Sequence, residues 1–76
     1  MKIKTLIKMA NSIGDFFNAE SDKELAANGV KKHILRSWHP RMRKELIAYY
    51  EQDGSELSDL VKVAVSGLES VSYLNI

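Results

Sequence analysis

The N-terminal part of the chain, residues 3–17, carries a helical pattern that restricts the folds open to this protein. Apolar side chains fill about half of a helical wheel, and lysine, asparagine, serine and aspartate fill the other half. A surface helix typically needs an apolar stripe of only about 100°. The pattern predicts an amphipathic helix with an unusually wide apolar face, which is a candidate interface for a homo-oligomer. The apolar positions are Ile3, Leu6, Ile7, Met9, Ala10, Ile13, Phe16 and Phe17.

A second helix is predicted to begin at Ser21, because Ser21-Asp22-Lys23-Glu24 has the pattern of a capping box. In such a box the Ser21 hydroxyl and the Glu24 carboxylate satisfy backbone N–H groups at the helix start. Asn28-Gly29 is expected to interrupt this helix, since glycine commonly follows a helix end. A short helix is then predicted over residues 30–38.

Pro40 marks the start of the next predicted helix. Proline suits the first position of a helix because its φ angle is already helical. The helical pattern then runs over residues 40–52, and Asp53-Gly54 is a typical stop signal. Ser58 is a plausible N-cap for a last helix over residues 59–68.

These patterns predict an all-α fold, a single small domain of about four short helices joined by tight turns. The domain is expected over residues 1–68, with a flexible tail over residues 69–76, where the periodicity is poor. A core in a chain of 76 residues supplies only about 3–5 kcal/mol, and without cysteine no disulfide can add to it. Stabilisation by assembly is therefore expected.

No stretch is apolar enough to suggest a membrane span. Lys4, Lys8, Asn11 and Asp15 interrupt the apolar segment that a secretory signal peptide requires. The expected location is the cytoplasm.

Charge is distributed unevenly, although the net charge is only +1. No acid occurs between Leu25 and Lys44, and this stretch attracts an acidic partner or a phosphate backbone unless it is simply a solvated face. Its cations are Lys31, Lys32, Arg36, Arg41, Arg43 and Lys44.

The run from Trp38 to Lys44 breaks local rules that the rest of the chain obeys. His39, the predicted N-cap, is a weaker cap than Ser, Asp or Asn, and the following cations sit at the positive end of the helix dipole. Local rules fail most often at functional sites, so this run is predicted to be a docking surface. The predicted partner-binding residues are Arg36, Trp38, His39, Pro40, Arg41, Arg43 and Lys44.

Arg43 falls within the apolar arc of its helix, between Ile47 and Tyr50. Two interpretations are open. Its head either extends to water from the first turn, or it is partly buried with its guanidinium forked onto a carboxylate or onto backbone carbonyls.

Catalytic signals are missing from the sequence. It contains no phosphate-binding glycine loop, no HExxH pattern and no cysteine nucleophile. His33 and His39 lie across a predicted helix end with no acid between them, which makes a metal pair improbable. The sequence therefore predicts no catalytic, cofactor-binding or metal-binding residues, and no enzyme.

A nucleic-acid-binding module is the main alternative, because short helices with a basic stretch are typical of such proteins. The isoelectric point of about 8.0 is below the value of about 9 expected for them. The supposed recognition helix also carries Met42, Leu46 and Tyr49 where base-reading side chains would be needed. Nucleic acid is therefore not the predicted partner.

Three segments resemble the delta subunit of NAD-dependent formate dehydrogenase. Residues 6–17, LIKMANSIGDFF, resemble the family's "MANQI…FF" opening, and residues 29–43, GVKKHILRSWHPRMR, resemble its "W-x-P-R-M-R" segment. Residues 54–61, GSELSDLV, are similar to its "GG-x-L-x-P-L-V" segment. The chain departs from the family pattern at His39, where aspartate is usual, and at Ser58-Asp59, where proline is expected.

The resemblance implies a non-catalytic, cofactor-free accessory subunit that helps to assemble or stabilise a cytoplasmic, molybdenum- or tungsten-dependent complex. In that family the alpha subunit carries the molybdopterin and iron–sulfur centres, and the beta and gamma subunits pass electrons to NAD. The implied partners are these larger subunits, and a free-standing homo-oligomeric helical protein is the remaining alternative.

Overall fold

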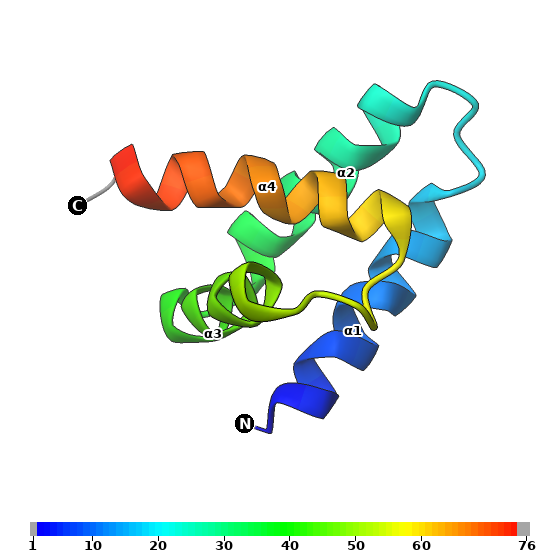
Figure 1. The fold of residues 1–76 in the computed structure, drawn as a ribbon. Coiled ribbons are helices and arrows are strands. Elements are labelled where there is room, and N and C mark those ends of the chain that lie inside the picture. The colour runs from blue at the N-terminus through cyan, green and yellow to red at the C-terminus, as the bar shows by residue number, and fades with distance from the viewer. Residues whose placement is uncertain (1, 75–76) are drawn as a thin grey trace.

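A computed structural model describes the backbone of residues 2–74 and the side chains of residues 2–69. The described chain consists of helices α1 (Ile3–Phe17), α2 (Lys23–Ser37), α3 (Pro40–Gln52) and α4 (Asp59–Leu74), and no strand occurs within it (Figure 1). The predicted all-α class is therefore confirmed.

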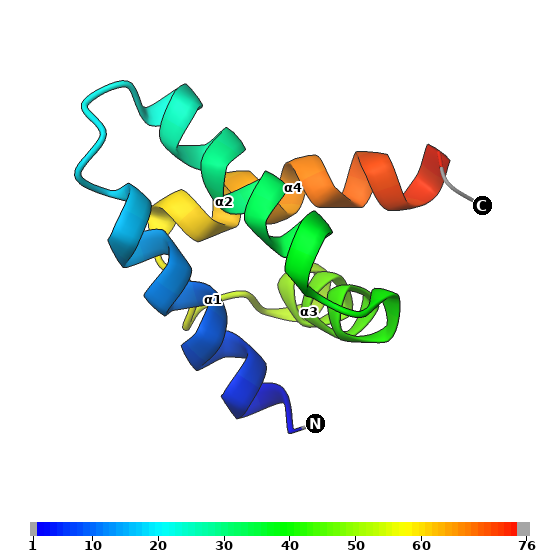
Figure 2. The ribbon, with the colours of Figure 1, turned by 180° about the vertical axis from the view of Figure 1, so that it is seen from behind.

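Helices α1 and α2 run side by side in opposite directions, and α3 follows a sharp corner at the end of α2 (Figures 1 and 2). Helix α4 packs against all three other helices and closes the core between them. Because α4 is the last helix in the chain, the core is complete only when α4 packs across the other helices.

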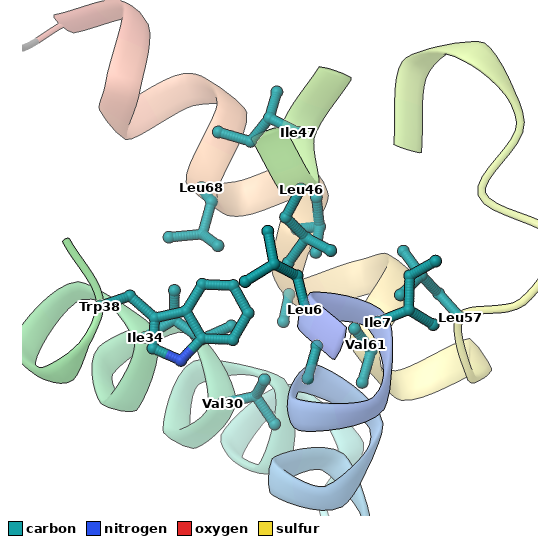
Figure 3. Close-up of a cluster of buried hydrophobic side chains, with 13 residues drawn as sticks. Leu6, Ile7, Val30, Ile34, Trp38, Leu46, Ile47, Leu57, Val61 and Leu68 are labelled. Carbon is teal, nitrogen blue, oxygen red and sulfur yellow. The ribbon is translucent and has the colours of Figure 1, made fainter. Parts of the chain in front are cut away.

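The core is built from one apolar stripe of each helix together with Trp38 and Leu57 from the connecting segments (Figure 3). Two of the apolar residues predicted for α1 are nevertheless left outside it: Ile3 is 36% exposed and Phe16 is 77% exposed. The apolar face of α1 is therefore only partly covered, as its width predicts. The fully buried larger side chains are Leu6, Val30, Ile34, Leu46, Val61, Val65 and Leu68.

The predicted break at Asn28-Gly29 is wrong, because α2 continues through both residues. A Cβ atom at Gly29 would lie only 2.5 Å from the ring of Phe17. Glycine is therefore needed here because α1 and α2 approach closely, and it does not mark the end of a helix.

The start of α2 is also one residue later than predicted, with Asp22 as the N-cap in place of Ser21. One carboxylate oxygen of Asp22 accepts hydrogen bonds from the backbone N–H groups of Glu24 at 3.0 Å and Leu25 at 3.3 Å. The backbone N–H of Asp22 donates to the carboxylate of Glu20 at 3.1 Å. Glu20, and not the predicted Glu24, therefore accepts the hydrogen bond from the N-cap residue.

The predicted turn between α3 and α4 is confirmed. Asp53 is the C-cap of α3, and Gly54 has the positive φ angle of 70° that favours glycine. The Ser58 hydroxyl accepts a hydrogen bond from the N–H of Val61 at 3.4 Å, as expected for an N-cap.

The side chain of Asn11 in α1, far away in the sequence, fixes this turn through two hydrogen bonds. Its Nδ2 donates to the carbonyl of Glu56 at 2.9 Å, and its Oδ1 accepts from the N–H of Ser58 at 3.0 Å. These two bonds join segments 45 and 47 residues apart and fix where α4 begins.

Helix α4 extends to Leu74, six residues beyond the predicted end at Leu68. The predicted boundary at residue 68 is therefore wrong for the helix. The flexibility expected for residues 69–76 stays a prediction, and residues 75–76 lie outside the described residues.

Candidate docking site

The sharp corner between α2 and α3 is fixed by backbone geometry on both sides. The N–H of Trp38 donates to the carbonyl of Ile34 at 2.9 Å and closes the last turn of α2. His39 is extended, with φ of −61° and ψ of 143°, and Pro40 starts α3. The Nδ1 of His39 accepts from the N–H of Arg41 at 3.1 Å, which confirms His39 as the N-cap.

Trp38, predicted as a partner-binding residue, has its side chain in the core. It is only 5% exposed and belongs to the same buried cluster as Ile34 and Leu6 (Figure 3). The burial of so large an apolar surface is strongly favourable, which explains why the indole turns inward. Trp38 therefore positions the corner and offers a partner almost no side-chain surface.

Arg43 is half-buried, and its Nη1 donates to the carbonyl of Trp38 at 3.0 Å. This contact supports the second of the two predicted interpretations, with a single backbone carbonyl as acceptor instead of a forked pair. It ties the first turn of α3 to the end of α2. The Nε of Arg43 is buried and makes no hydrogen bond to the described residues.

The remaining predicted residues are exposed around the first turn of α3. Arg41 and Lys44 project from α3, and Arg36 projects from the last turn of α2. Within the described part of the chain, the side-chain hydrogen bonds of this region are those of His39 and Arg43 alone. We call this surface the basic corner, and it consists of Arg36, His39, Pro40, Arg41, Arg43 and Lys44.

The basic corner is chemically suited to binding an anion or an acidic surface. Exposed guanidinium and ammonium groups donate hydrogen bonds to carboxylates and phosphates. Over residues 2–69, no group of three or more His, Asp or Glu side chains is placed to hold a metal ion. None of the helices described here combines the length and the apolar character needed to cross a membrane.

A groove beside the basic corner was not predicted from the sequence. Its lining residues come from α1 and α2, from Trp38 directly after α2, and from Met42 of α3. A groove of this kind depends on three elements that meet only in the fold. The signal in the sequence is the repeat of Thr5, Met9, Ser12 and Phe16 along one edge of the first helix.

The described residues thus form a small all-helical domain with an exposed basic corner. A family model described as the NADH-dependent formate dehydrogenase delta subunit, FdsD, matches residues 5–65. This chain belongs to that family, which confirms the resemblance found in its sequence segments. No curated protein and no solved structure matches the chain.

Proposed function

We propose that this chain is a non-catalytic accessory subunit of a cytoplasmic formate dehydrogenase complex that depends on molybdenum or tungsten and is linked to NAD. It docks on a larger subunit through the basic corner and stabilises the complex or helps to assemble it. It binds no cofactor of its own.

The observation that carries this proposal is the family match over residues 5–65, which includes the whole basic corner. The charge of the corner supports a docking role. Three cations at and beside the start of α3, Arg36, Arg41 and Lys44, are exposed and have no carboxylate partner among the described residues. Arg41 and Lys44 lie near the N-terminus of α3 and oppose its helix dipole, so an acidic partner surface would relieve this repulsion.

The burial of apolar side chains of α3 argues against the nucleic-acid alternative. Leu46 is buried, and Met42 and Tyr49 are partly buried against the core, so much of the helix surface is taken up by packing. A recognition helix presents base-reading side chains to the major groove over several turns.

Co-purification tests the proposal. The tagged chain, expressed in its source cells, should purify from the cytosol together with the larger subunits. The purified material should reduce NAD when formate is added. The same protein should show no strong binding to duplex DNA. Recovery of the chain alone or only with itself, or DNA binding that falls steeply with salt, would contradict it.

A further inference from the structure

A groove runs along one edge of α1, beside the basic corner (the helices that form it can be followed in Figure 2). Its main part is about 520 Å³, with Met9 and Ile13 of α1 opposite His33 of α2. At Ser12, Ile13 and His33 it continues into a second hollow of about 310 Å³, which ends at Phe16 and Phe17. We call the two hollows together the α1–α2 groove.

The shape of the α1–α2 groove suits a helix better than a compact small molecule. The α1 side chains that line it run from Thr5 to Phe17, which spans about 18 Å at 1.5 Å per residue. Three to four turns of a second helix laid alongside would cover this length.

Apolar side chains in the groove remain available to a partner. Phe16 is the most exposed large apolar side chain of the described residues, and its ring meets that of Phe17 edge-on at 5.1 Å. Met9, Ile13 and Met42 are only partly buried. Exposed apolar surface of this kind marks interaction sites, and methionine adapts well to a partner's shape.

The charge of the groove selects the partner's chemistry. The residues that line its two hollows include Lys8 and His33 and no acid. A separate hollow near the start of α4 is lined by Glu24 and Asp59 together with Lys23, so acids are not excluded from hollows in general. The occupant that complements the groove is apolar on one face and acidic along its edges.

We propose that the α1–α2 groove binds an acidic amphipathic helix of a larger subunit. This inference rests on the proposed function and extends the docking surface from the basic corner across Met42 into the groove. A second copy of the chain fits less well, because most of the apolar surface of its own helices is packed in its core. Its most exposed apolar side chains outside the groove are Leu25 and Val63.

Blocking the groove tests this inference. Ser12 lines both hollows and is exposed, so Ser12→Arg fills the groove without reversing its charge or removing a core contact. We expect co-purified larger subunits to bind this variant about tenfold more weakly or worse, the range of a truncated hot spot. Ser66→Arg, at an exposed serine of α4 outside the groove, is the matched control and should change affinity less than about twofold.

The charge of the groove is tested separately. Lys8→Glu reverses a charge at its edge, whereas Lys32→Glu makes the same change on an exposed residue that does not line it. The Lys8 variant should bind the larger subunits more weakly than the Lys32 variant, and the difference should shrink as salt is raised. Equal binding of the two variants at low salt would contradict an acidic occupant.

The occupant is identified with a photo-crosslinking phenylalanine analogue at position 16 in the assembled complex. The expected product joins Phe16 to an acidic amphipathic segment of a larger subunit, and crosslinking to a second copy of this chain would overturn the inference. Wild-type-like binding by the Ser12 variant would also overturn it, while the proposed function stands. If the wild-type chain does not co-purify with the larger subunits, the proposed function fails, and this inference fails with it.

Discussion

Two helix starts in this small domain are built in opposite ways. Helix α2 begins with Asp22, whose carboxylate accepts two backbone hydrogen bonds, and Glu24 follows in its first turn. Helix α3 begins with His39, which accepts one such bond, and has no acid in its first turn. Both negative groups of α2 complement the helix dipole, whereas Arg41 and its neighbours oppose it.

One helix start is stabilised by its own residues, and the other leaves charges available to a partner. At the start of α2, Asp22 accepts hydrogen bonds from backbone N–H groups, and Asp22 and Glu24 complement the helix dipole. The start of α3 is held in place by packing and by the bond from Arg43 to the Trp38 carbonyl, and Arg41 and Lys44 are left exposed. A surface whose charges are unfavourable for its own helix can gain free energy when an acidic partner covers it.

The largest expected effect comes from the residue that holds the α2–α3 corner in place. Trp38→Ala removes a buried indole from the core and should lower the free energy of unfolding by about 3–5 kcal/mol, as much as a core of this size supplies, so the variant should be largely unfolded without urea. Circular dichroism in buffer detects the loss of helix, and urea unfolding of the wild-type chain gives the stability against which it is compared. Val63→Ala, at a side chain that is 58% exposed, is the control and should have little effect. A loss below about 1 kcal/mol for Trp38→Ala would mean that the indole does not support the corner.

The N-cap of α2 should come next. Asp22→Ala removes both capping hydrogen bonds and should lower the free energy of unfolding by about 1 kcal/mol. Ser21→Ala is the matched control, because Ser21 lies next to the cap and does not act as one. If the Ser21 variant is the less stable of the two, the start of α2 has been assigned to the wrong residue.

A designed reversal at α3 should have the opposite sign. His39→Asp supplies a better cap and a negative charge at the positive end of the helix, so it should raise the free energy of unfolding by about 0.5–1 kcal/mol. The same change lowers the positive charge of the basic corner and should weaken binding to the larger subunits. Stability and affinity that rise together would argue against a trade-off at this corner.

Features that depend on local pattern could be predicted from the sequence. Helices α1 and α3 have the predicted bounds, since apolar periodicity and Pro40 act within a few residues. His39 and Ser58 were correctly predicted as caps for the same reason.

Features that depend on distant contacts could not be predicted. Gly29 resembles a helix stop until Phe17 is placed against it, and nothing near Asn11 reveals that it holds a turn 45 residues away. The candidate site shows the same division. The cations of the basic corner were found from charge alone, whereas the groove beside Met42 appears only when three helices pack together.

Arg41→Ala has the smallest expected effect on stability and tests the central claim most directly. The side chain is exposed and opposes the helix dipole, so its removal should leave the free energy of unfolding unchanged or raise it by a few tenths of a kcal/mol, about 0.5 at most. Binding of the same variant to the larger subunits should weaken about tenfold, because arginine dominates interface hot spots. Paired urea unfolding and binding titrations on one preparation measure both quantities. Unchanged stability with weakened binding is the predicted result, and wild-type binding by this variant would contradict the account.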